Sequence, residues 1–174
     1  NTTAPTSDQA RDVGYDSAVL TNHSVEEATR TVAAERLIAL ANDRISGAVE
    51  ALADALAHPE PEIRRVLLEV LGRQPKPIEG LLDPLITTLR NAPAPLRDAY
   101  AAVIATYGEA GLDRASVVAL DRSGTPDARL GAIYAMGAFP TRDSGDRLME
   151  LTSPARGEDE AIVKAAFESL RRLA

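Results

Sequence analysis

A repeat with a period of 32–35 residues limits most strongly what this chain can fold into. In each copy, an apolar segment ends at a Leu, a short polar link containing Pro follows, and a cation opens a second apolar segment. The cations are Arg64, Arg97, Arg129 and Lys164, which are spaced by 33, 32 and 35 residues. A period of this length fits two helices and two short links. Because a single helical hairpin leaves its apolar stripe exposed, neighbouring hairpins must stack to cover it.

The apolar residues of the second segments recur with the period of an α-helix. Ile63, Val66, Leu67, Val70 and Leu71 fall at i, i+3, i+4, i+7 and i+8, which places them on one stripe. The same spacing recurs 33 residues later at Leu96, Ala99, Tyr100, Val103 and Ile104. We therefore expect both segments to be amphipathic helices, and we expect one more, degenerate helix over residues 25–42 before them.

Prolines and glycines mark the predicted ends of these second helices. The prolines stand at the starts, where the missing N–H costs nothing and the fixed φ suits a helix: Pro61, Pro95 and Pro126. The glycines follow the last apolar residues, where a left-handed residue is expected: Gly72, Gly108 and Gly137. Start and stop signals thus agree with the stripes in three copies of the repeat.

The composition also favours helices over strands. The chain has 31 Ala and 20 Leu among its 174 residues, and both residue types lose little on entering a helix. An all-β fold would need more β-branched and aromatic residues, whereas aromatic residues make up only 3% of this chain. Since the chain has no Cys, disulfides, thiolate metal sites and thiol nucleophiles are excluded.

The charge argues against nucleic acid as a partner, and the hydropathy argues against a membrane span. The net charge of −7 repels phosphate backbones, and no apolar run approaches the roughly 20 residues that a span needs. The sequence starts at Asn1 rather than Met, so we expect a processed chain or a fragment. Its compartment stays open: the cytoplasm, or the periplasm or exterior if a signal peptide was removed before Asn1.

The first 24 residues stand outside the repeat. We expect residues 1–24 to form a lead-in, a linker or an N-terminal cap, and residues 25–174 to form the repeat domain. The cap would be the segment from Asp8 to Leu20. Its apolar contacts would be Val13, Tyr15, Val19 and Leu20.

The link and second helix resemble HEAT repeats, in particular the bacterial subtype similar to the phycobilisome-lyase HEAT-like family. The stretches that carry the resemblance are HPEPEIRRVLLEVLG, residues 58–72, and GTPDARLGAIYAMG, residues 124–137. The resemblance covers about residues 25–174. It departs from the usual pattern at Ala94, where an acid is typical, and in the last copy, where the link is longer and Lys164 replaces Arg.

This resemblance implies an all-α, right-handed α-α superhelix, a HEAT-like solenoid of about 4.5 helical-hairpin repeats. The second helix of each repeat would line the concave face. The family implies binding more than chemistry, because the activities of its members reside in particular sites and not in the repeat itself.

The cation that recurs in each copy has two interpretations. The ladder of Arg64, Arg97, Arg129 and Lys164 would bind anions, or it would stabilise the stack by pairing with link acids such as Glu62 or Asp127, or with carbonyl groups. We favour the structural interpretation, because a contact that recurs in every copy is typical of a stacking device.

The residues opposite the buried stripe of each second helix are candidates for contact with a partner. If the stripes are buried, the outward positions carry charged, apolar and aromatic side chains: Arg65, Glu69, Asp98, Ala102, Leu130, Tyr134, Ser169 and Arg172. Leu130 and Tyr134 lie one turn apart, and an aromatic side chain in a groove is a typical binding anchor. A bent helix would instead turn both residues into the next interface.

The sequence offers little for catalysis. His23 and His58 lie in or beside links, and neither has a neighbouring His. The iron site of the hydroxylase members of the family needs His-Glu dipeptides, and none is present. No Gly-rich phosphate loop or nucleophile motif occurs either. We therefore expect no catalytic residue, no metal site and no cofactor.

Three functions remain open. The first is a non-enzymatic scaffold whose concave face binds a protein segment or another domain of a longer parent chain. The second is a lyase or chaperone-like subunit that acts on a tetrapyrrole-carrying protein. The third is a structural spacer in a larger envelope or secreted protein.

Overall fold

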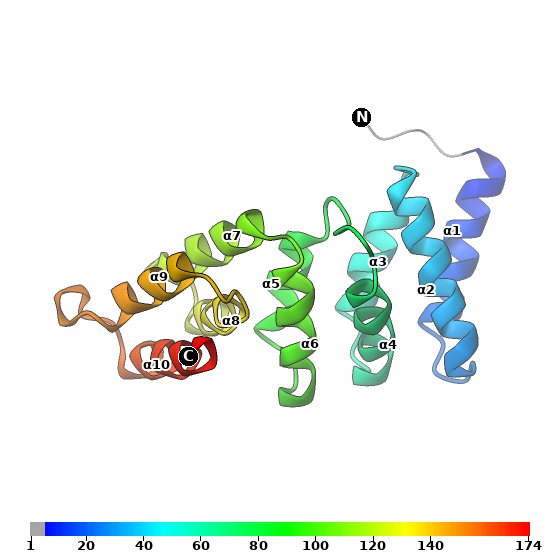
Figure 1. The fold of residues 1–174 in the computed structure, drawn as a ribbon. Helices are drawn as coiled ribbons and strands as arrows, with labels where there is room; N and C mark the ends of the chain where they lie inside the picture. The colour runs from blue at the N-terminus through cyan, green and yellow to red at the C-terminus, as the bar shows by residue number, and fades with distance from the viewer. Residues whose placement is uncertain (1–5) are drawn as a thin grey trace. The chain divides into compact units, whose positions relative to one another are not determined.

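A computed structural model describes residues 6–174 of the chain. These residues form ten α-helices, α1 to α10, and one short 3₁₀ helix, η1, with no strand among them (Figure 1). The all-α part of the prediction is therefore confirmed. The chain divides into two compact units, of which unit 1 ends at Leu85 and unit 2 comprises Ile86–Ala174.

Unit 1 contains four complete helices. Their bounds are Ser7–Leu20 for α1, Glu27–Asn42 for α2, Ala48–Leu56 for α3 and Pro61–Gly72 for α4. Helix α1 packs against α2 and α3, and α2 also packs against α4. Among the side chains that fill the space between the helices and are fully buried are Leu20, Leu37, Leu52 and Leu67.

Unit 2 contains five complete α-helices and one 3₁₀ helix. Its helices are α6 Ala94–Ala105, α7 Glu109–Leu120, α8 Pro126–Met136, α9 Arg142–Thr152, η1 Pro154–Arg156 and α10 Glu160–Leu173, while α5, Leu82–Leu89, spans the junction of the units. The pairs α7/α8 and α9/α10 pack as hairpins, and α8 contacts both α6 and α10. Helix α8 is therefore the central helix of this unit.

The segment expected to be a lead-in, a linker or a cap contains helix α1. Leu20 is fully buried, as its predicted contact role requires, and Asp16 is 4% exposed beside Arg36. Tyr15 was predicted to be an apolar contact as well, but it is 63% exposed, so this part of the prediction is wrong. Tyr15 lies at the exposed edge of the α1/α2 pair, and Asp16 is the residue that turns inward.

The predicted helix starts are confirmed, and so are the helix ends at Gly72 and Gly137, but the left-handed conformation expected at these two glycines is wrong. Pro61 and Pro126 are the first residues of α4 and α8, and Pro95 is the second residue of α6. Of the three glycines only Gly108 has a positive φ, +60°, but it is the N-cap of α7, and α6 ends three residues earlier at Ala105. Gly137 has φ −66° and serves a different purpose, because a Cβ there would lie 3.0 Å from the Cβ of Ser169 in α10. Gly72 has open space around it, and nothing in the structure explains it.

Candidate partner-binding groove in unit 2

Arg129 is the ladder residue whose contacts are most complete. Its Nε donates to the carbonyl of Ala119 at 2.9 Å, and its terminal nitrogen donates to Glu158 at 2.7 Å. Arg156 donates to the other oxygen of Glu158 at 2.9 Å. Burial opposes ionisation of Glu158, but the hydrogen bonds from both arginines outweigh it and hold the pKa of this carboxyl below its usual value. This buried ion cluster ties α8 to the link before α10.

The other three ladder residues have different surroundings. Arg97 is exposed, and its Nε donates to the carbonyl of Ala92 at 3.2 Å. Lys164 is exposed on α10. Arg64 is 8% exposed, and within residues 6–174 its buried Nε has no hydrogen-bond acceptor. Glu62, a predicted acid partner of the ladder, accepts hydrogen bonds from Arg65 instead. The recurrence in sequence therefore does not impose one common set of contacts.

A fifth member of the ladder, Arg30, escaped the sequence reasoning. It precedes Arg64 by 34 residues, which continues the spacing of the repeat into α2. Its side chain is 6% exposed, and two of its guanidinium nitrogens have no partner in the described part of the chain. The spacing alone points to this residue, but the apolar pattern of residues 25–42 is too degenerate to fix its register.

Two of the predicted partner-binding residues lie in unit 1 and are engaged with one another. Arg65 of α4 forms salt bridges with Glu69, with Glu62 and with Glu27 of α2. The hydrogen bond from Arg65 lowers the pKa of Glu62. These partly exposed pairs form a charged network across α2 and α4, and such networks contribute little stability for each pair.

Three further predicted residues meet in unit 2, from three different helices. The hydroxyl of Tyr134 in α8 donates to Asp98 of α6 at 2.7 Å. Arg172 of α10 stacks on the Tyr134 ring, 4.0 Å from its centroid, and donates to the Tyr134 carbonyl at 3.1 Å. Burial, followed by the hydrogen bond to Asp98, raises the pKa of the Tyr134 phenol above its usual value. The aromatic ring is therefore restrained at its hydroxyl by Asp98 and at its face by Arg172.

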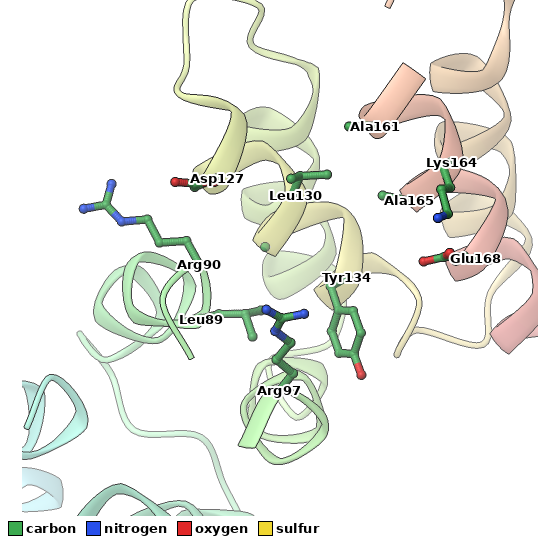
Figure 2. Close-up of a pocket in the computed structure, with 11 residues that line it drawn as sticks. Leu89, Arg90, Arg97, Asp127, Leu130, Tyr134, Ala161, Lys164, Ala165 and Glu168 are labelled. Atoms are coloured by element: carbon green, nitrogen blue, oxygen red, sulfur yellow. The ribbon is translucent and has the colours of Figure 1, made fainter. Parts of the chain in front are cut away.

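A groove of about 340 Å³ lies beside this ring. We call it the α8–α10 groove. Its lining comprises Leu89, Arg90, Arg97, Asp127, Leu130, Gly131, Tyr134, Ala161, Lys164, Ala165 and Glu168. Figure 2 shows Leu130 and Tyr134 on successive turns of α8, with the residues of α10 across from them. Gly131 lets α8 approach the backbone of Arg90 closely at this groove, because a Cβ there would lie 3.0 Å from it.

Ser169 was predicted to lie outward beside Arg172, and this prediction is wrong. Ser169 is 2% exposed, and its hydroxyl donates to the carbonyl of Ile133 at 2.9 Å. It occupies the space that Gly137 leaves free, so α8 and α10 approach closely at this point. The close approach turns Ser169 inward, while Arg172, nearly one turn further along α10, reaches over Tyr134.

A larger hollow of about 700 Å³ lies elsewhere in unit 2, lined in part by Leu112, Phe139, Pro140 and Arg147. Arg147 there already pairs with Asp113 and Asp143, each at 2.7 Å. None of the predicted partner-binding residues lines this hollow.

In the described residues, no three His, Asp or Glu side chains gather in a way that could hold a metal ion. No helix of residues 6–174 combines the length and the apolar character needed to cross a bilayer.

No model of a known protein family matches the chain, and no curated protein matches its sequence.

Proposed function

We propose that this chain is a non-enzymatic protein-interaction module of HEAT-repeat type, with about 4.5 helical-hairpin repeats in a right-handed superhelix over residues 25–174. Its partner would be a segment of another protein or a domain of a longer parent chain, bound at the second helices of the repeats. The HEAT-like residues of the links and second helices support the assignment to this type. Within unit 2 we place the binding site in the α8–α10 groove.

The observation that carries this proposal is the fixed Tyr134 ring beside Leu130 at the wall of the α8–α10 groove. Both side chains are partly exposed, although they lie on the central helix of the unit. The hydrogen bond to Asp98 and the stacking of Arg172 already restrict the tyrosine before any partner arrives. A restricted anchor loses less conformational entropy on binding, which favours affinity. Partly exposed aromatic side chains in a concave site are typical centres of binding energy.

The test begins with selection of binding peptides from a displayed random library on the full chain. The affinity of the selected peptide is then measured for the wild type, for Leu130→Asp and for Tyr134→Ala. We expect each substitution in the groove to weaken binding at least tenfold, which corresponds to about 1.4 kcal/mol.

The matched control is Val117→Asp, because Val117 is an aliphatic residue of α7 in the same unit and is 60% exposed outside the groove. This variant should bind like the wild type. Unchanged affinity in both folded groove variants would contradict the proposal, and so would an equal loss in the control.

A further inference from the structure

We propose that the segment bound in the α8–α10 groove is an acidic peptide, with carboxylate side chains on either side of one apolar residue. This inference rests on the proposed function and names the chemistry of the partner. Three cations in the lining of the groove carry the argument: Arg90, Arg97 and Lys164.

These three cations have no acidic partner within the described residues, where no carboxylate oxygen lies within 4.0 Å of them. The other groove residues that bear charge are Asp127 and Glu168. By contrast, Arg129, Arg147 and Arg156 of the same unit are each bound to at least two acceptors, of which at least one is a carboxylate. Unit 2 has 12 acidic and 11 basic side chains. A lack of acids therefore does not explain why the groove cations are unpaired.

The geometry suits carboxylates placed around an apolar anchor. Figure 2 shows Arg97 beside Tyr134, Arg90 beyond Leu89, and Lys164 across the groove on α10, with Leu130 between them. Arg97 donates its Nε to the carbonyl of Ala92, which fixes the base of its guanidinium group and leaves both terminal nitrogens to donate. An apolar side chain against Leu130 and Tyr134 would thus place its neighbours within reach of these cations.

The acids of the molecule favour a peptide over a nucleic acid. A continuous phosphate chain carries a charge at every residue and would pass Asp127 and Glu168 in the groove. A peptide, in contrast, can place neutral residues opposite these two carboxylates. At about 340 Å³, the groove also lies at the small end of ligand sites, which fits a side chain and its flanking residues.

The experiment uses three pools of short, fluorescently labelled peptides with one central Leu, which differ in their flanking residues. The flanks are Asp and Glu, or Asn and Gln, or Lys and Arg. Fluorescence anisotropy with the full chain should show that the acidic pool binds at least about tenfold more tightly than the Asn/Gln pool. The preference should fall as salt is added, because the interacting charges are exposed.

Reversing the charge of single cations on α10 then tests whether the preference for acidic peptides arises in the groove. Lys164→Glu should remove the preference for the acidic pool. Arg171→Glu changes the charge by the same amount on the same helix, outside the groove, and should preserve it. Both residues are exposed, so both variants should retain the helical circular dichroism of the wild type.

Each other outcome overturns the inference in an identifiable way. Equal binding of the acidic and Asn/Gln pools, lost in Leu130→Asp, would leave the groove as a binding site and refute its acidic preference. Absence of binding by all pools would contradict the proposed function as well. If Lys164→Glu still prefers the acidic pool, the site that recognises acidic peptides lies outside the groove. Tighter binding of labelled oligothymidylate than of the acidic pool, lost in Lys164→Glu, would identify the groove as a nucleic-acid site.

Discussion

Replacement of Glu158 by Ala is expected to destabilise unit 2 by about 3–5 kcal/mol, the range for a buried ion pair that loses one partner. The Glu158 side chain is 1% exposed and accepts hydrogen bonds from Arg129 at 2.7 Å and from Arg156 at 2.9 Å. In the variant, Arg129 keeps its bond to the Ala119 carbonyl but remains buried without a counter-charge. A loss of this size is a large share of the roughly 5–15 kcal/mol that stabilises a typical domain.

Urea unfolding of the full chain measures this loss, followed by far-UV circular dichroism and by tyrosine fluorescence. Three of the four tyrosines, Tyr100, Tyr107 and Tyr134, lie in unit 2, so the fluorescence reports mainly on that unit. The control is Glu150→Ala. Glu150 bonds to the same Arg156 at 2.6 Å but is 51% exposed, so its loss should cost less than about 1 kcal/mol. Equal losses in the two variants would refute the view that burial of the ion cluster ties α8 to the link before α10.

Three further predictions concern packing and ionisation in unit 2. Gly137→Ala should destabilise the protein by about 1–3 kcal/mol, because the new Cβ meets Ser169. Gly145→Ala, in the open interior of α9, should instead stabilise it by about 0.4–1 kcal/mol. The urea unfolding midpoints of the two variants measure these changes, and equal shifts would contradict the packing argument. The folded state lowers the pKa of Glu158 below 4.5. The difference in unfolding free energy between wild type and Glu158→Gln should therefore be constant above pH 4.5 and shrink as the pH falls below that value. A difference that persists undiminished in acid would contradict this linkage. The folded state raises the pKa of Tyr134, so the stability that its neutral phenol contributes should be present below pH 10 and lost as the pH rises through the folded pKa. In ultraviolet difference titrations of wild type against Tyr134→Phe, the phenol should ionise above pH 10.0, and ionisation at or below that value would contradict it.

The starts of the second helices and their buried stripes could be predicted from the sequence because both depend on local chemistry. A proline in the first turn and an apolar residue every third or fourth position act within one helix, whatever surrounds it. Ile63 and Leu67 are both fully buried, as the stripe predicts. The burial of Arg129 does not follow from the spacing alone, because Arg97 and Lys164 stand at the same position of the repeat and are exposed.

The contacts between helices could not be predicted, because they depend on how each helix is rotated against its neighbour. Close packing at Gly137 turns Ser169 inward, and no periodicity within α10 reveals this. The role of Glu158 was hidden for a related reason. It lies in the irregular link after η1, where Gly157 adopts a left-handed conformation and the chain leaves the pattern of the repeat. A partner 29 residues from Arg129 then becomes its nearest acid.

The α8–α10 groove and the cluster beside it depend both on the pattern within single helices and on the contacts between helices. The sequence identified Asp98, Tyr134 and Arg172 separately, as outward positions on three helices. Only the packing of α6 and α10 on either side of α8 brings them into one cluster. The cations Arg90 and Lys164 join the same surface from outside α8, and only the folded arrangement shows that they line the groove together.

Amide NMR spectra of the full chain, recorded while the acidic peptide pool is added, test the central claim most directly. If the α8–α10 groove is the binding site, the largest shift changes should fall on Leu130, Gly131 and Lys164, with Gly145 of α9 unaffected. Changes that centre on α9 or on unit 1, while Gly131 remains unchanged, would contradict it.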